Sequence, residues 1–160
     1  MALDGMFLYQ LRHEIAQLAL DARVDRIHQP TREEIIIALR WRGGAGKLLL
    51  SANAGGARIH FTETSPENPK QPPMFCMLLR KHISNGRIID ITQPSLERIV
   101  DFEIEHLNEL GDVCRKHLII ELMGKHSNII FYDEQQKILD SIKHISGMVS
   151  SVREVLPGRT

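Results

Sequence analysis

Apolar residues near the start of the chain recur at a helical spacing that gives way to short strand-like runs. Phe7, Leu11, Ile15 and Leu18 follow one another at intervals of four, four and three residues, so they predict one face of a helix. Asp4 is its expected N-cap, and the helix should end near residue 22. Turn signals at residues 29–30, 43–44 and 55–56 then separate β-prone runs, which predict strands at 24–29, 34–42, 47–52 and 58–62.

A second helix is predicted by the segment PPMFCMLLRKH, residues 72–82. Pro72 and Pro73 suit a helix start, and the unbroken apolar run at 74–79 predicts a helix surrounded by protein. Arg80, Lys81 and His82 follow at its C-terminal end. Either they offset the helix dipole, or the helix holds a cationic cluster against the phosphates of a partner.

A second series of strands is predicted at 87–92, 98–106, 116–123, 127–132 and 138–143. In the second of these, Val100, Phe102 and Ile104 alternate with acidic residues, the pattern of a strand with one wet face. The order of helix, strands, helix, strands predicts an α+β fold, a β-sandwich of two mainly antiparallel sheets with flanking helices.

Length and composition favour a single domain over residues 1–160, with a core that needs neither disulfides nor metal. The 20 basic and 20 acidic residues cancel, so bulk charge identifies no partner. Cys76 and Cys114 are predicted to be core thiols in a reducing compartment. With no signal sequence or membrane span, we expect a cytoplasmic protein without membrane contact. VLPG at 155–158, with no closing helix, suggests an excised first domain.

The sequence lacks the signatures of common catalytic sites, so we expect no enzyme activity and no cofactor. Its eight histidines have no zinc-like spacing, which argues against a metal site. The glycines at 43, 44 and 46 before Lys47 are not spaced as a phosphate loop and predict a hairpin turn.

Two polar segments are candidate binding sites. The turn at 124–128 contains Lys125, His126, Ser127 and Asn128 and could present several donors to one acceptor. Alternatively, its glycine supplies a special φ while Ser127 and Asn128 bond to the backbone. Glu97-Arg98 is the second segment. It could offer a planar guanidinium fork to a phosphate or a base edge, or it could be a solvated strand end.

Charge distribution narrows the expected contact surface. Residues 100–113 contain five acidic side chains and no Lys or Arg, so this hairpin should face away from a phosphate backbone. Contact is expected on the side that carries the basic residues Arg80, Lys81, Arg87, Arg98 and Lys125.

Six segments in order give the chain a family resemblance: LDGMF from Leu3, RIHQP from Arg26, KLLLSA from Lys47, NPKQPPMFCMLLRKHI from Asn68, MGKHSNII from Met123 and VLPG from Val155. Over nearly all its length the chain resembles the N-terminal domain of the NFACT family, the group that includes fibronectin-binding protein A, RqcH and NEMF. The resemblance implies a fold similar to the N-terminal domain of MutM-type DNA glycosylases, followed in the full protein by further domains.

The resemblance also implies a function. Members of the family bind the large ribosomal subunit that carries a stalled nascent chain and recruit tRNA, alanyl-tRNA in bacteria, for C-terminal tailing without mRNA. An Asp-Arg pair that recognises the tRNA anticodon arm corresponds here to Glu97-Arg98. Glu97 departs from the usual Asp by one methylene, which bears on base specificity more than on binding.

Two alternatives remain open. A glycosylase-like fold suggests base excision, but those enzymes use an N-terminal proline amine, and here Ala2 follows Met1. The adhesin name within the family suggests fibronectin as a partner, although the sequence has neither a secretion signal nor an anchor.

Overall fold

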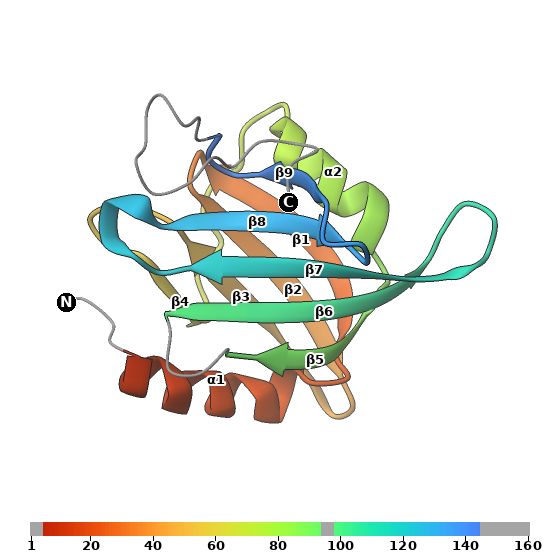
Figure 1. Cartoon of the computed structure of the whole chain (residues 1–160), viewed down its shortest axis with the longest axis horizontal. Coiled ribbons are helices and arrows are strands. Elements are labelled where there is room, and N and C mark those ends of the chain that lie inside the picture. Colours follow the sequence, from red (N-terminus) through yellow and green to blue (C-terminus); the bar gives the residue numbers. More distant parts are fainter. Residues whose placement is uncertain (1–4, 94–97, 145–160) are drawn as a thin grey trace.

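The computed structural model of the chain describes residues 5–93 and 98–144 and contains two helices and nine strands in those ranges (Figure 1). The elements are α1 (Gly5–Ala19), β1 (Arg23–Thr31), β2 (Glu34–Trp41), β3 (Gly44–Ser51), β4 (Arg58–Thr62), α2 (Met74–Ile83), β5 (Arg87–Thr92), β6 (Ile99–Leu107), β7 (Val113–Glu121), the 3-10 turn η1 (Gly124–His126), β8 (Asn128–Asp133) and β9 (Ile138–Ser141). The predicted α+β class and both series of strands are confirmed, with shifted ends. Neither described helix is long and apolar enough to cross a membrane.

The described strands form one antiparallel sheet in the order β4-β3-β2-β1-β5-β6-β7-β8-β9. Its two halves are joined where β1 meets β5 through one residue pair, Arg23 with Arg87, and adjacent backbone bonds such as Val24 N–H to Gly86 C=O at 2.8 Å. Figure 1 shows β6–β8 in front of β1–β3, so the sheet folds over on itself. The expected two separate sheets are thus one continuous sheet.

The main hydrophobic core lies between the two halves of the sheet and the helices. It combines Ile37 and Leu50 of the first half with Phe102, Leu118 and Phe131 of the second. Helix α1 packs against β5, β2 and β4, whereas α2 packs against β1, β6 and β9. The helices therefore cover the open sides of the folded sheet.

The face that helix α1 presents to the core overlaps the predicted one, since Ile15 is buried and Leu11 packs against the core, but it is rotated away from Leu18. Leu8, Ile15 and Ala19 are buried, whereas Leu18 is 45% exposed. At 100° per residue, Leu18 lies roughly 80° from the line through Leu8, so it lies at the edge of the core-facing side. The helix ends at Ala19 instead of residue 22, while Asp4 and the side chain of Phe7 lie outside what the structure describes.

Helix α2 is not surrounded by protein, as its unbroken apolar run predicted. Phe75, Cys76, Leu79 and Ile83 are buried, but Met74 is 82% exposed and Met77 is 52% exposed. The helix lies on only one side of the folded sheet, so its other side faces solvent, even though two of the residues there, Met74 and Met77, are apolar.

The turns of the first half follow the sequence signals with one exception. Gly43 has a φ of 88° in the β2–β3 hairpin, as expected for the glycine-rich turn. Gly46 is needed for space, because a Cβ there would lie 2.8 Å from Cη2 of Trp41. Pro30, predicted to mark a turn, lies inside β1 at an irregularity between His28 and Thr31. A bulge tolerates proline because no ladder N–H is needed there.

Candidate nucleic-acid interface

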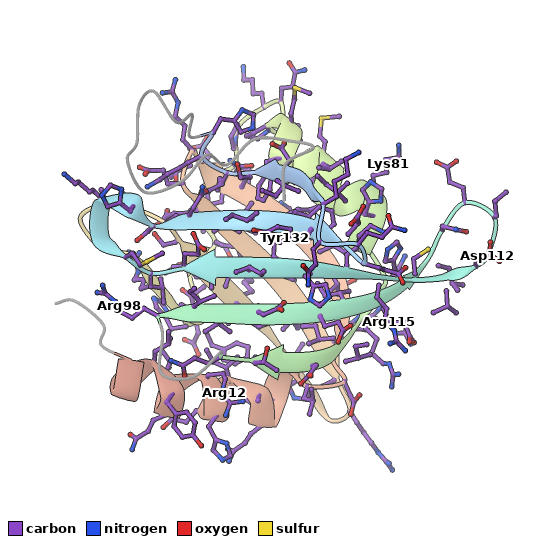
Figure 2. The ribbon with its side chains drawn as sticks, viewed as in Figure 1. Arg12, Lys81, Arg98, Asp112, Arg115 and Tyr132 are labelled. Atoms are coloured by element: carbon purple, nitrogen blue, oxygen red, sulfur yellow. The ribbon has the colours of Figure 1, made fainter. Side chains whose placement is uncertain are left out.

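Arg98 lies immediately before β6, at the end of the strand opposite the β6–β7 hairpin (Figure 2). Its backbone carbonyl accepts a hydrogen bond from Leu122 N–H at 2.8 Å, which fixes the chain as it enters the sheet. Its side chain is exposed and forms no hydrogen bond or ion pair with another described residue. Glu97 lies outside the described residues. Arg98, the described member of the predicted pair, thus holds its guanidinium toward solvent on a fixed backbone.

The turn at 124–128 reaches the surface with only two of its four predicted contact residues. Ser127 and Asn128 are fully buried. Ser127 Oγ accepts from Met123 N–H at 2.8 Å, and the Asn128 amide donates to Lys143 C=O and accepts from Lys143 N–H, both at 3.0 Å. These two side chains hold the turn together, which is the alternative based on backbone bonding.

The remaining two side chains, Lys125 and His126, are exposed and half-buried respectively. Gly124 begins η1 with a φ of 59°, which allows the chain to turn sharply after β7. Because Leu122 N–H donates a hydrogen bond to Arg98 C=O, the turn lies at the same end of the sheet as Arg98. Lys125 follows Leu122 by three residues, at most about 11 Å of extended chain.

Arg80 points inward and is bound to β1. Its Nε donates to Ile27 C=O at 2.7 Å, and its Nη2 lies 3.3 Å from His28 Nδ1. Burial, followed by the charge of Arg80, lowers the pKa of His28 below its ordinary value. Arg80 therefore connects α2 to the first half of the sheet and is not a free surface cation.

Arg87 lies near the opposite end of β6 from Arg98 and is paired with acids. It contacts Asp21 at 3.3 Å and Glu105 at 3.7 Å, and Glu105 also faces Arg115 at 3.9 Å. On the solvent-facing side of β6, Glu105 is thus paired with cations of both neighbouring strands, β5 and β7. Nine residues of β6 span roughly 30 Å, so Arg87 and Arg98 do not form one basic patch.

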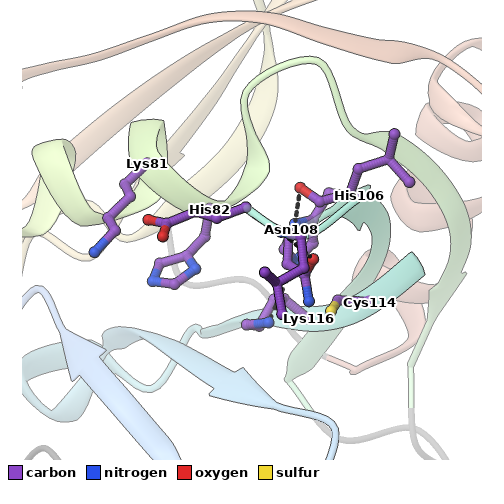
Figure 3. Close-up of a pocket in the computed structure, with 9 residues that line it drawn as sticks. Lys81, His82, His106, Asn108, Cys114 and Lys116 are labelled. Atoms are coloured by element: carbon purple, nitrogen blue, oxygen red, sulfur yellow. Dashed lines mark hydrogen bonds between the residues drawn. The ribbon is translucent and has the colours of Figure 1, made fainter. Parts of the chain in front are cut away.

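Lys81 lines a cavity of about 550 Å³ between the end of α2 and the β6–β7 hairpin. His82 comes from the same helix, and His106 and Lys116 come from β6 and β7 (Figure 3). Neither His106 nor Lys116 was among the candidate site residues predicted from the sequence. One signal was present, because His106 continues the alternating buried positions of β6 and is only 7% exposed.

The two cysteine thiols have different surroundings. Burial raises the pKa of the Cys76 thiol, whose Sγ lies 3.5 Å from Ile27 C=O. Cys114 is half-buried, so the prediction of two core thiols holds for Cys76 alone. Within residues 5–93 and 98–144, no three His, Cys, Asp or Glu side chains are arranged to hold a metal ion.

Comparison with known proteins gives a consistent family match. A family model described as the NFACT N-terminal and middle domains matches residues 4–160. The Rqc2 homolog RqcH of Bacillus subtilis is 46% identical over 160 residues, 99% of this chain and 28% of the relative. The ribosome quality control complex subunit NEMF of Homo sapiens is 32% identical over 136 residues, 83% of this chain and 12% of that protein.

Solved structures with the same fold carry different names. The N-terminal domain of fibronectin-binding protein PavA from Streptococcus pneumoniae has a TM-score of 0.94 and 40% identity, covering 98% of this chain and 60% of that one. A fibrinogen binding protein from Staphylococcus aureus has a TM-score of 0.86 and 33% identity, covering 99% of this chain and 55% of that one. The chain thus spans little more than a quarter of the Bacillus relative.

Proposed function

The chain belongs to the NFACT family, and from this premise we propose that it is a non-catalytic RNA-binding domain of a cytoplasmic ribosome quality-control factor. The observation that carries the proposal is the match of nearly the whole chain to relatives named RqcH and NEMF. In the whole factor, the partners would be a large ribosomal subunit with a stalled nascent chain and a tRNA, alanyl-tRNA in bacteria. The activity would be mRNA-independent C-terminal tailing.

Within this domain, the tRNA contact is assigned to Glu97 and Arg98. The exposed guanidinium of Arg98 and its fixed backbone support the assignment, since a planar fork needs a defined origin to read a base edge or a phosphate. Lys125 and His126 lie at the same end and would add phosphate attraction. The buried Ser127 and Asn128 would act indirectly, by shaping the turn that carries Lys125.

The test places Arg98→Ala in the full-length protein and compares the tRNAs and large subunits that co-purify with it. Loss of one tRNA while subunit association persists is expected. Arg115→Ala is the matched control, because it removes an exposed arginine near the other end of the same strands. An unchanged tRNA profile would move RNA recognition to another surface.

A lysine in place of Arg98 distinguishes the contribution of the planar guanidinium from that of the positive charge. Arg98→Lys keeps the positive charge but loses the bidentate fork, so specific tRNA recovery should fall while its salt dependence persists. If the lysine variant recovers tRNA as well as the parent does, then only electrostatic attraction operates at Arg98.

Fibronectin binding is a second candidate, favoured by the close structural match to the N-terminal domain of a fibronectin-binding protein. Binding of the chain to immobilised fibronectin would then persist in Arg98→Ala, because nothing in this function depends on the proposed tRNA contact. Absence of saturable binding by the parent chain would remove this candidate.

A further inference from the structure

The cavity between α2 and the β6–β7 hairpin brings together cationic and imidazole side chains from distant parts of the sequence. Lys81 and His82 enter from the helix, whereas His106 and Lys116 enter from the strands (Figure 3). In this view His82 lies between Lys81 and Lys116. The hairpin adds an apolar part of the lining with Leu107 and Leu110, which are 67% and 85% exposed.

Lys116 is held in place by a buried histidine. Its Nζ lies 3.2 Å from His106 Nε2, and His106 Nδ1 lies 3.4 Å from Leu107 C=O. The carbonyl can only accept, so Nδ1 carries the proton and Nε2 accepts from the ammonium. One of the three N–H groups of Lys116 is then occupied, and the other two remain available to a ligand.

The two lysines lack the carboxylate partners that other cations of this chain have. In the described part of the chain, no carboxylate oxygen lies within 4.0 Å of Lys81 or Lys116, although Glu109 lines the same cavity. On the opposite face of β7, Arg115 is paired with Glu105. Two positive charges therefore border the cavity with only partial compensation from Glu109.

The pKa values of the His82 and His106 imidazoles are lowered by the surroundings in the cavity. Burial is the largest cause that lowers the pKa of His82, followed by the charge of Lys116, whereas Glu109 raises it. Burial and Lys116 also lower the pKa of His106, against smaller raising effects of the Leu107 carbonyl and Glu134. Both rings therefore hold a proton less readily than a free imidazole, and an anion beside them would favour their protonation.

We propose that this cavity binds a phosphate group, held between the ammonium groups of Lys81 and Lys116 with the His82 imidazole as a further donor. The apolar side chains of Leu107 and Leu110 leave room for the ribose or base attached to that phosphate. The site lies at the far end of β6 from Arg98, so it does not depend on the proposed tRNA contact.

The first test titrates the 160-residue chain with inorganic phosphate at constant ionic strength and follows the histidine ring signals by NMR. Saturable shifts of His82 and His106 are expected, with a rise in their titration midpoints, while the exposed His13 stays unchanged. Shifts that match those produced by chloride would show ordinary screening and overturn the proposal.

The second test uses variants whose folding is checked by circular dichroism. Lys81→Gln and Lys116→Gln should each weaken phosphate binding about tenfold, because each removes a charge-assisted hydrogen bond. Lys116→Arg should retain binding, which distinguishes lost charge from a disturbed hairpin. Arg42→Gln and Lys70→Gln are the controls, because these exposed cations do not line the cavity, and both should bind phosphate as the parent does. Undiminished binding by the Lys81→Gln, Lys116→Gln double variant would refute the site.

A third comparison identifies the source of the phosphate group. Adenosine monophosphate and a short single-stranded RNA, with and without a 5′-phosphate, are titrated in the same assay. Tighter binding that requires the terminal phosphate assigns the site to a nucleotide or RNA end, whereas equal binding of both RNAs assigns it to the strand backbone. Failure of all three ligands to shift His82 and His106 would overturn the proposal while leaving that for Arg98 intact.

Discussion

Replacing Arg80 decides between its two interpretations, a phosphate contact or a structural connection between α2 and β1. The structure favours the connection, because Nε donates to Ile27 C=O at 2.7 Å and Nη2 lies 3.3 Å from His28 Nδ1. β1 pairs with β5 only at Arg23 in the described ranges, so α2 supplies donors to β1 beyond that point. We therefore expect Arg80→Met to destabilise the fold and to leave RNA binding unchanged.

The magnitude follows from the contacts that are lost. A hydrogen bond from a charged donor contributes about 1.5–3 kcal/mol, and the half-buried position of Arg80 favours the lower part of that range. Methionine keeps much of the apolar stem, and Ile27 C=O keeps its weak contact with Cys76 Sγ at 3.5 Å. We expect a loss of about 1.5–2 kcal/mol in the free energy of unfolding, or a fall in Tm of roughly 3–8 °C for a domain of this size.

The assay is urea denaturation followed by far-UV circular dichroism, with the m-value compared between variants. Arg80→Lys should recover part of the loss because it can still donate to the carbonyl. Lys81→Met, one residue along and exposed, is the matched control and should change stability by less than about 0.5 kcal/mol. The reasoning fails if Arg80→Met unfolds at the same urea concentration as the parent, or if it loses RNA binding with its stability intact.

Three other changes test the core, the turn between α2 and β5, and the histidines. Leu79→Ala should cost about 2–5 kcal/mol in denaturation because Leu79 is fully buried, whereas Met77→Ala, at an exposed position of the same helix, should cost less than about 0.5 kcal/mol. Gly86→Ala should cost about 1–3 kcal/mol by the same measurement, because the new Cβ would lie 2.8 Å from Ile104 Cγ2 and 3.0 Å from Ile83 C=O. Stability should also fall as pH drops from 7.5 through the ordinary histidine pKa of 6.5, because the unfolded state there binds protons that the folded state does not; the three residues responsible are His28, His82 and His106. A denaturation series across this range checks the sign, and a triple His→Gln variant should flatten the slope; an unaltered slope would contradict the assignment.

The strands could be predicted from the sequence because buried and exposed residues alternate within each short segment. Val100, Phe102 and Ile104 point inward and their acidic neighbours outward, so one segment of sequence contains the whole signal. The way the sheet folds was not readable, because it depends on the pairing of Arg23 with Arg87, which are 64 residues apart. No local pattern distinguishes one folded sheet from two sheets packed together.

The candidate site also combines features that the sequence predicts with features that it does not. The exposure of Arg98 and Lys125 agrees with their polar settings at a strand start and in a turn. The inward direction of Arg80 was hidden, because an arginine at the end of an apolar helix has the same sequence signal whether it meets solvent or a strand carbonyl. The phosphate cavity was hidden for another reason, since its lysines are far apart in the chain and meet only when α2 packs beside the β6–β7 hairpin.

A chain with no net charge can still attract RNA where the fold leaves cations without carboxylates. Many of its basic residues are neutralised nearby, and the ion pairs that do so are Arg40–Asp25, Arg58–Glu34, Arg87–Glu105, Arg115–Glu105 and Lys143–Glu33. In the described ranges, Arg98 and Lys125 escape such pairing at one end of β6–β8, and Lys81 and Lys116 escape it at the other. If one RNA contacts both ends, removing the cations of either end should reduce the slope of log K against log salt by about 0.7 for each lost phosphate contact. If the ends bind separate ligands, removing one will leave the salt dependence at the other unchanged, so the slope measures directly whether the two regions act together.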